Sequence, residues 1–335
     1  MFKPGNAQPS GDPGVLVVRL GSMGDVIHAL PAVATLKYSF PGRHVSWVID
    51  RQWACLLDGN PFVDQVVLLD RRTLSGIKQA WRELRARRYA LAVDFQGLCK
   101  SALAASCARP DRLYGFHQSQ AREPVAALFY SKRVRTRAAH VVDRNLELAA
   151  AAGASSILYA FPLPAGCEEG ELPAGDFVLA SPFAGWAGKQ WPLEYYSLLA
   201  QRLQQELGLP LVLSGPPRAA GSLAQVAGAL SYVSTVPGLI HATRRARAVL
   251  GIDSGPLHLA AALDKPGVAV FGPTDPARNG PYGKSFTVLR APGAATTYKR
   301  RQEIDPSMRE ISPDAVLTAL KDRLAGRSRG AGVSS

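Results

Sequence analysis

The chain has 335 residues, of which 47% are hydrophobic and 19% are charged, and this composition excludes a mostly disordered protein. The length exceeds the size at which one hydrophobic core usually stops growing, so we expect two domains. The excess of 39 Lys and Arg over 26 Asp and Glu gives a net charge of +13. Such a surplus favours an anionic partner, whether nucleic acid, phospholipid headgroups or a phosphorylated substrate.

No uninterrupted apolar run approaches the ~20 residues that span a bilayer, and the first 14 residues, rich in Pro and Gly, lack the apolar stretch of a signal peptide. We therefore expect a cytoplasmic protein that at most touches a membrane, with residues 1–14 disordered. The four cysteines form no Cys-x-x-Cys pair, which favours reduced core thiols over a zinc site or disulfides. They are Cys55, Cys99, Cys107 and Cys167.

The first half of the chain alternates strands with helices. A β-branched run at residues 15–20 passes through a tight turn into a helical pattern at 26–38. Further strands are predicted at 45–50, 63–69, 91–95 and 112–116, and a helix at 141–152. This alternation is typical of a parallel sheet with helices on both faces.

The second half repeats the first in kind. Periodicity is lost in a Pro- and Gly-rich stretch before residue 176, where we place the domain junction. Buried strands are then predicted at 177–181, 209–215, 248–253 and 267–272, with a helix at 193–206. The prediction is an α/β fold of two Rossmann-like, doubly wound domains facing a cleft, an N-terminal domain at 15–165 and a C-terminal domain at 176–311. A C-terminal helix at 312–325 and a disordered tail at 326–335 complete the chain.

Loops that follow strands should hold the function, because ligands of open α/β sheets bind beyond the carboxyl ends of the strands. The first such loop contains Gly21, Ser22, Gly24 and Asp25, and its glycines let the backbone approach a ligand. The loop lacks the Gly-x-Gly-x-x-Gly spacing of a dinucleotide site. Asp25 is either a helix cap or a functional carboxylate at the start of a helix facing the cleft.

Two loops of the second half suit a phosphate. Lys189 lies in a glycine-bearing loop just before a helix, where it either neutralises a phosphate or is an ordinary solvated lysine. Asp253, Ser254 and Gly255 end a buried strand and open a helix, whose free N–H groups form an anion site for a pyrophosphate. His258 in that helix is either a satisfied helix histidine or a donor contact.

A further strand-to-turn junction holds Thr274 and Asp275, which are either turn formers or walls of the site. Two basic clusters remain. The first, Arg82, Arg85, Arg87 and Arg88, is either a solvated helix face or an anion contact. The second, which follows Phe129 and Tyr130, favours a membrane or acceptor contact and consists of Lys132, Arg133, Arg135 and Arg137.

These loops, taken together, resemble those of the lipopolysaccharide heptosyltransferases of glycosyltransferase family 9. The resemblance runs over residues 15–292 and rests on six loops in the same order. They are GSMGD at Gly21, DFQGLCKS at Asp94, QSQAREPVAALFY at Gln118, GKQWP at Gly188, DSGPLHLAAALDKP at Asp253 and FGPTDPARNGPYG at Phe271.

The resemblance implies a GT-B fold, an ADP-heptose donor, a Kdo-lipid A acceptor, peripheral contact with the cytoplasmic face of the inner membrane, no nucleic-acid partner and no cofactor. It implies that the catalytic residues are Asp25, as the base, and Lys189, which contacts the donor phosphate. The donor-binding positions would be Ser22, Gly24, Ala184, Lys189, Leu239, Asp253, Ser254, Gly255 and His258. The acceptor-binding positions would be Arg71, Arg72, Gln96, Gly97, Lys100, Arg122 and His140.

The chemistry suits these residue types. Displacement at an anomeric carbon needs a carboxylate to take the proton of the attacking hydroxyl, and cations or helix N-termini to stabilise the departing diphosphate. The sequence has no Asp-x-Asp, so we predict inversion in one step without a metal. Phe183 and Ala184 stand where relatives often carry hydroxyl residues, so backbone N–H groups would serve the phosphate there.

Three alternatives to a heptosyltransferase that adds the first heptose to Kdo-lipid A are compatible with the sequence. The nearest is a later-step heptosyltransferase or another family 9 glycosyltransferase. A second class is an NAD-dependent oxidoreductase or sugar-nucleotide epimerase on paired Rossmann domains. The third is a non-catalytic module that holds an anionic glycolipid or nucleic acid.

Overall fold

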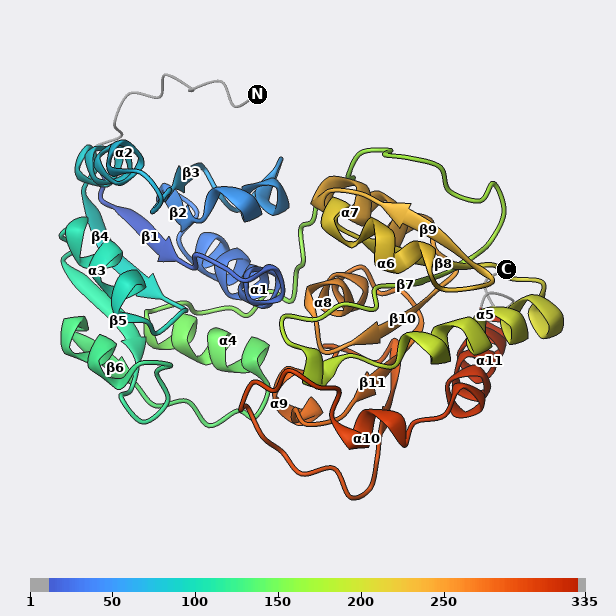
Figure 1. The fold of residues 1–335 in the computed structure, drawn as a ribbon. Coiled ribbons are helices and arrows are strands. Elements are labelled where there is room, and N and C mark those ends of the chain that lie inside the picture. The colour runs from blue at the N-terminus through green and yellow to red at the C-terminus, as the bar shows by residue number, and fades with distance from the viewer. Residues whose placement is uncertain (1–11, 331–335) are drawn as a thin grey trace. The chain divides into compact units, whose positions relative to one another are not determined.

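The computed structural model describes residues 12–330, which form two compact units. The N-terminal unit contains the residues up to Ala138 together with Val142–Pro162, and the C-terminal unit contains Ala139–Val141 together with the residues from Leu163 onward. Each unit is built on its own parallel sheet (Figure 1).

The sheet of the N-terminal unit has six strands in the order β3-β2-β1-β4-β5-β6, and all pairs are parallel. The central strand β1 is buried along its whole length, because β2 and β4 flank it and helices cover both faces. The strands are β1 (Gly14–Val18), β2 (Val45–Ile49), β3 (Gln65–Leu68), β4 (Tyr89–Asp94), β5 (Arg112–Phe116) and β6 (Lys132–Val134).

The helices of this unit form two layers. They are α1 (Met23–Ser39), η1 (Arg51–Leu57), α2 (Leu74–Arg85), α3 (Cys99–Cys107), η2 (Pro124–Phe129) and α4 (Val141–Ala151). Helices α2, α3 and η2 cover one face of the sheet, where their small inner side chains meet Leu16 and Val18 of β1. On the other side α1 and α4 pack together, and the Asn145 side chain donates to the backbone oxygen of His28 at 3.0 Å.

The sheet of the C-terminal unit has the order β12-β11-β10-β7-β8-β9, again all parallel. The strands are β7 (Val178–Ala180), β8 (Leu211–Gly215), β9 (Ala229–Val233), β10 (Ala248–Ile252), β11 (Gly267–Phe271) and β12 (Phe286–Arg290). Both units therefore share one topology, in which the winding direction reverses between the first and the fourth strand. The reversal lies between β1 and β4 in one sheet and between β7 and β10 in the other, and such points create ligand crevices.

Helices α5 and α11 complete the core of the C-terminal unit. The helical segments are η3 (Ala187–Lys189), α5 (Leu193–Leu207), η4 (Pro217–Ala219), α6 (Ala220–Ala224), α7 (Val236–Arg245), α8 (Gly255–Ala262), α9 (Pro276–Asn279), α10 (Pro306–Arg309) and α11 (Pro313–Gly330). Leu199 of α5 and Leu320 of α11 are both fully buried in the same cluster. The Arg323 side chain ties α11 to the edge of the sheet through the Thr287 hydroxyl at 2.7 Å and the Phe286 oxygen at 2.8 Å. Within residues 12–330, no helix is both long enough and apolar enough to cross a membrane.

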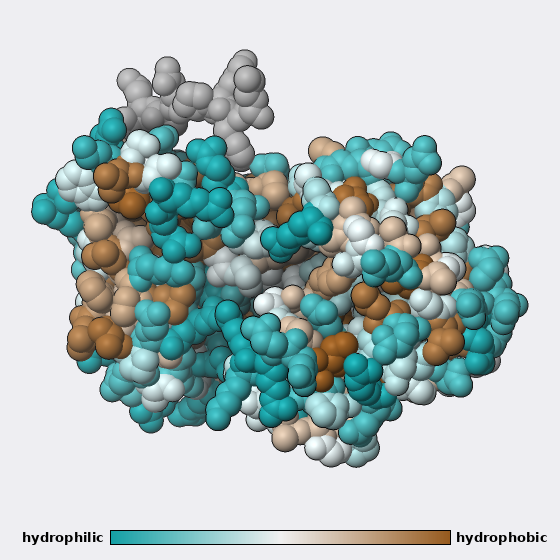
Figure 2. All heavy atoms as spheres, in the orientation of Figure 1, coloured by the Kyte–Doolittle hydropathy of each residue, from teal (hydrophilic) through white to brown (hydrophobic). Residues whose placement is uncertain are grey.

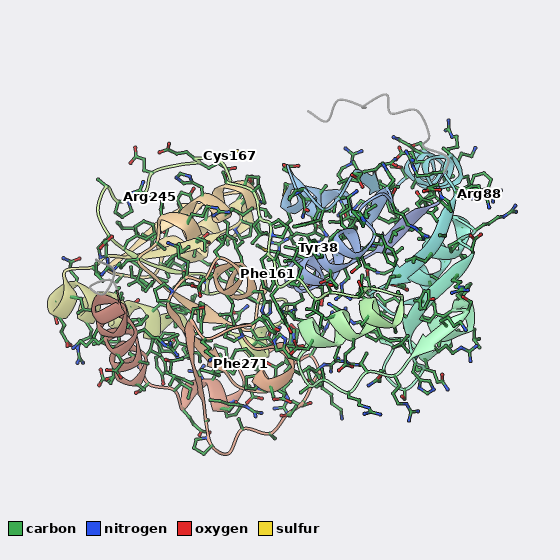
Figure 3. The ribbon with its side chains drawn as sticks, turned by 180° about the vertical axis from the view of Figure 1, so that it is seen from behind. Tyr38, Arg88, Phe161, Cys167, Arg245 and Phe271 are labelled. Carbon is green, nitrogen blue, oxygen red and sulfur yellow. The ribbon has the colours of Figure 1, made fainter. Side chains whose placement is uncertain are left out.

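The segment between α4 and β7 has no regular structure, and its part from Leu163 onward runs along α7. Arg244 donates to the oxygen of Leu163 at 2.9 Å, and Arg245 donates to the oxygen of Pro173 at 3.1 Å. Figure 3 shows Cys167 in this segment and Arg245 on α7 beside it. Cys167 is exposed and the other three cysteines are only partly buried, so the prediction of core thiols was wrong.

The predicted strands and helices differ from the structure mainly at edges and ends. Strands β6, β9 and β12 were missed; each is an edge strand with exposed positions, so it lacks the continuous apolar run of a central strand. Helix α11 begins at the predicted Pro313 but continues to Gly330, five residues into the predicted disordered tail, because no proline interrupts it and glycine is tolerated in a helix. Strand β1 includes Gly14, which we had placed in the disordered N-terminus. The remaining predicted disorder, at residues 1–11 and 331–335, lies outside the described residues.

Candidate active site

The carboxyl ends of β1 and β4 are locked together at the switch point of the first sheet. The side-chain oxygen of Gln96 accepts from the backbone N–H of Leu20 at 2.7 Å, and the backbone N–H of Phe95 donates to Val18 at 3.1 Å. Gln96, which the family resemblance places at the acceptor, is buried, and its amide oxygen joins the two loops. Gln96 therefore supports the site by holding the loops after β1 and β4 together, with its side chain buried.

Asp25 lies on the first turn of α1, with its carboxylate at this same edge. Its Oδ2 accepts from the backbone N–H of Ser22 at 3.0 Å and from the Ser22 hydroxyl at 3.1 Å, so Ser22 is the N-cap and Asp25 supports it from the third helical position. The two sequence interpretations of Asp25 are thus compatible. Its side chain is 25% exposed, so the carboxylate is both a helix-capping group and accessible to a ligand.

Two arginines flank this carboxylate. Arg19 forms an ion pair with Oδ1 of Asp25, and a guanidinium nitrogen of Arg122 lies 3.4 Å from Oδ2. Burial raises the pKa of Asp25, but the two guanidinium groups and the Ser22 hydrogen bonds outweigh burial and hold the pKa below its ordinary value. Asp25 is therefore a charged carboxylate at neutral pH.

Arg19 is a site residue that the sequence reasoning missed. It was counted within the strand at 15–20, but the strand ends at Val18, and Arg19 begins the loop with its side chain almost fully buried. Its guanidinium also donates to the backbone oxygen of Phe95, so it bridges the loop after β4 to Asp25. The available signal was a charged residue at the end of an otherwise apolar strand, since a buried charge normally needs a partner.

Some of the predicted acceptor residues gather around Asp25. Gly97 has a φ of +69°, a conformation that favours glycine, and an added Cβ would lie 3.2 Å from the backbone nitrogen of Arg122. The oxygen of Gly97 also accepts from the N–H of Glu123 at 2.9 Å, which positions the half-exposed Arg122 beside Asp25. Lys100 is exposed on α3, which begins two residues after Gly97.

The other acceptor candidates lie elsewhere. Arg71 follows β3, where it lies 3.4 Å from the carboxylate of Asp50, and Arg72 is exposed in the same turn. His140 belongs to the C-terminal unit, although we had placed it in the N-terminal domain. Its Nε2 lies 3.1 Å from the oxygen of Gly280 and its ring 5.0 Å from that of Tyr282, because residues 139–141 pack on that loop.

In the C-terminal unit, Lys189 and Asp253 meet at the second switch point. Lys189 follows β7 and its ammonium group lies 3.2 Å from the Asp253 carboxylate, with 15% of the lysine side chain exposed. Nε2 of His258 lies 3.7 Å from the same carboxylate. Burial raises the pKa of Asp253, but His258 and Lys189 outweigh burial and lower the pKa to about 2. Asp253 therefore orients Lys189, whose side chain remains partly exposed.

The beginning of α8 can hold an anion. Ser254 is the N-cap and Gly255 the first residue of the helix. Within residues 12–330 the buried Oγ of Ser254 has no hydrogen-bond partner, so it can serve a ligand. Together with the helix N-terminus and Lys189, this hydroxyl provides positive potential and donors for a diphosphate. His258 is buried against Asp253, which favours the interpretation as a satisfied helix histidine.

Two further predicted donor residues, Ala184 and Leu239, are apolar, and the two residues of the strand-to-turn junction after β11 have structural roles. Ala184 packs against the core of the C-terminal unit, and Leu239 is buried on α7. Asp275 is a turn former, because its carboxylate caps α9 by accepting from the N–H of Ala277 at 2.9 Å, and Thr274 is buried. Among residues 12–330 no three His, Cys, Asp or Glu side chains are grouped so that they could hold a metal ion, and we assign no metal ligands.

Two doubly wound units, each with charged side chains at its switch point, define a two-domain α/β enzyme of the GT-B class. The family model of glycosyltransferase family 9 (heptosyltransferase) matches residues 77–308. The chain belongs to this family. It is therefore a glycosyltransferase, and the oxidoreductase, epimerase and non-catalytic alternatives are set aside.

The similarity covers most of the chain. Lipopolysaccharide heptosyltransferase 1 of Escherichia coli (strain K12) is 32% identical over 303 residues, which cover 83% of this chain and 93% of that protein. The enzyme of the same name from Pseudomonas aeruginosa (strain PAO1) is 32% identical, over 81% of this chain and 82% of its own. The solved structure of E. coli heptosyltransferase WaaC with ADP matches with a TM-score of 0.75 and 27% identity, over 92% of this chain and 99% of that one. A second WaaC structure, with ADP-2-deoxy-2-fluoro heptose, has a TM-score of 0.72 and 28% identity over the same shares.

Proposed function

We propose that the protein transfers L-glycero-D-manno-heptose from ADP-heptose to the Kdo of a Kdo-lipid A acceptor in the lipopolysaccharide inner core, with inversion and without a metal. One observation carries the proposal: each unit offers one half of the required chemistry at its switch point. The N-terminal unit has the ionised, accessible carboxylate of Asp25, and the C-terminal unit has Lys189 beside the N-terminus of α8. The matched WaaC structures contain ADP and an ADP-heptose analogue, which supports the proposed donor.

In the proposed reaction Asp25 accepts the proton of an acceptor hydroxyl as that oxygen attacks the anomeric carbon of the donor. The carbon–oxygen bond to the diphosphate breaks in the same step, so the configuration inverts. A low pKa makes Asp25 a weak base in the ground state, but the proton becomes far more acidic as the new bond forms. Lys189, the Ser254 hydroxyl and the N–H groups of α8 stabilise the negative charge on the departing ADP.

The acceptor side of the proposal rests on Arg122, Gly97 and Lys100. A Kdo residue carries a carboxylate and lipid A carries phosphates, so cations near Asp25 suit this acceptor. Arg71, Arg72, Gln96 and His140 complete the proposed set, with Gln96 acting from within the loop. The acceptor is anchored in a lipid bilayer, and we place the protein in the cytoplasm, at the surface of the inner membrane.

The test measures ADP release from ADP-heptose with a Kdo-bearing acceptor. We expect release by the wild type, inverted configuration in the product by nuclear magnetic resonance, and an unchanged rate with excess chelator. Release no faster than that of an Asp25→Ala control would remove the donor assignment. A rate that is high only with an acceptor already carrying heptose would identify a later step of the core.

A further inference from the structure

The layer formed by α2, α3 and η2 exposes large hydrophobic side chains, together with cations, on the side that faces away from the sheet. Large hydrophobic side chains are exposed on all three elements, and the two most exposed are Leu74 at 82% and Leu128 at 72%. Seven of the fourteen exposed large hydrophobic side chains within residues 12–330 belong to this surface, which we call the outer strip. They are Leu74, Ile77, Trp81, Leu103, Val125, Leu128 and Phe129.

The outer strip is not needed to fill the core. The same elements already bury their inner sides against the sheet with Leu84 and a series of alanines, among them Ala80, Ala102 and Ala126. Small side chains thus face inward and large apolar ones outward, the reverse of an ordinary surface helix. Figure 2 shows hydrophobic patches over α2 and α3 on the N-terminal unit. A cluster of large exposed apolar side chains of this kind points to an interaction site.

Nearly all of the surplus positive charge lies on the same stretch of chain. Residues 71–137 contain fifteen Lys and Arg but four Asp and Glu, a surplus of eleven out of the thirteen of the whole chain. One of the four acids, Asp94, is fully buried and accepts from Tyr130, so it does not offset the surface charge. Exposed cations lie on or next to the elements that carry the outer strip. Figure 3 shows one of them, Arg88, at the edge of the N-terminal unit. These cations are Lys78, Arg82, Arg85, Arg88, Lys100, Lys132 and Arg133.

We propose that the outer strip binds the surface of a phospholipid bilayer that carries anionic headgroups. Exposed leucines, a tryptophan and a phenylalanine flanked by long cationic side chains are the composition of segments that lie in the interface of a membrane. The aliphatic stems of Lys and Arg cover apolar surface while their charges reach the headgroups. A nucleic acid would instead need aromatic side chains on which bases stack, and most of the strip is aliphatic.

This inference rests on the proposed function only for the expectation that the acceptor is embedded in lipid. It adds which surface of the N-terminal unit meets the bilayer. Because binding to vesicles needs neither donor nor transfer, the two proposals can fail separately.

The experiment measures sedimentation of the full chain with two kinds of vesicle. One contains phosphatidylethanolamine with about a quarter phosphatidylglycerol, and the other contains only neutral phosphatidylcholine. The variant Leu74→Asp/Leu128→Asp removes the two most exposed side chains of the strip. The matched control Leu198→Asp/Leu230→Asp makes the same change at two leucines of the C-terminal unit that are half exposed.

We expect the wild type to bind the anionic vesicles, more weakly at high salt, and the strip variant to bind them at least about tenfold more weakly. The control should stay within about twofold of the wild type, and Lys132→Gln/Arg133→Gln should lose about tenfold. The strip variant should keep the wild-type melting temperature and should release ADP normally with a water-soluble Kdo acceptor without lipid.

Equal vesicle binding by the strip variant and the wild type would overturn the proposal, as would equal binding to neutral and anionic vesicles. A wild type that binds no vesicles but forms a dimer in sedimentation velocity, lost in the strip variant, would assign the strip to a second copy instead. Vesicle binding without any ADP release would leave the strip assigned to the membrane and would refute the transfer reaction alone.

Discussion

Asp25 performs two tasks with one carboxylate. It completes the cap of α1 through Ser22, and it presents an ionised oxygen at the end of β1. Arg19 and Arg122 approach different oxygens of the carboxylate, which fixes its orientation. A residue so constrained loses little entropy on meeting a substrate, and preorganisation of this kind favours catalysis.

Replacing Asp25 by Asn tests the proposed base. The amide has the same size and can still accept a hydrogen bond from Ser22, but it cannot take a proton. We expect Asp25→Asn to lower kcat for ADP release by about a hundredfold or more, with donor affinity by calorimetry nearly unchanged. Asp64→Asn removes another ion-paired carboxylate of the same unit and should leave kcat alone. A wild-type kcat in Asp25→Asn would reduce Asp25 to its capping task.

The pH profile reports on Arg122. If Asp25 is the base, activity requires the deprotonated carboxylate and is lost as the pH falls through the pKa of Asp25. Because Arg122 helps to lower that pKa, Arg122→Gln should raise it and move the acid limb of kcat to higher pH. The profile at saturating acceptor is the measurement, and Arg112→Gln, at an exposed arginine of β5, is the control. An acid limb at the wild-type pH would show that Arg122 does not lower the pKa of Asp25.

For single residues, the sequence predicted which loops hold the site better than it predicted which side chains contact each other there. Gly97 and Arg122, 25 residues apart, do meet beside Asp25 in the structure. Arg19 escaped notice because an ion pair inside a fold has no signature in sequence spacing. The misplacement of His140 has the same origin, since only the fold brings it to Gly280.

Among the elements, the central strands were readable because burial on both faces demands an unbroken apolar run. Strands β2, β5, β10 and β11 begin at their predicted residues. The edge strands β6, β9 and β12 each pair with the strand that precedes them, but they carry polar and exposed positions, so packing in the folded protein decides their pairing rather than a local apolar pattern. The identity of strand order between the two sheets likewise required the structure.

The contact between β5 and the end of η2 depends on a glycine. A Cβ on Gly115 would lie 2.2 Å from the ring of Tyr130, whose hydroxyl donates to the buried Asp94 at 2.7 Å. Gly115→Ala should therefore lower the free energy of unfolding by roughly 1–3 kcal/mol, measured by urea denaturation. Gly42→Ala, where an added Cβ meets no atom within 4 Å, should change it by less than about 0.5 kcal/mol. Equal midpoints for the two variants would contradict the packing.

For the molecule as a whole, nucleotide binding should affect the two units unequally. If ADP binds at the start of α8, hydrogen exchange with saturating ADP should slow most in peptides around Ser254 and Lys189. The core strands β2 and β5 of the N-terminal unit should exchange as before. Lys189→Ala should need more ADP for the same protection. Protection that is absent around Ser254 would move the donor site elsewhere.

Because α11 lies at the end of the chain, the two units can complete their cores at different times during synthesis. The core of the N-terminal unit is complete once residue 162 has been made, whereas the second sheet waits for Val316, Leu317 and Leu320. Until those residues leave the ribosome, the part of the sheet that α11 covers, at β11 and β12, stays open to water. The C-terminal unit therefore remains incompletely folded while about 150 residues are translated. During this interval the nascent chain exposes the most apolar surface that a chaperone could bind.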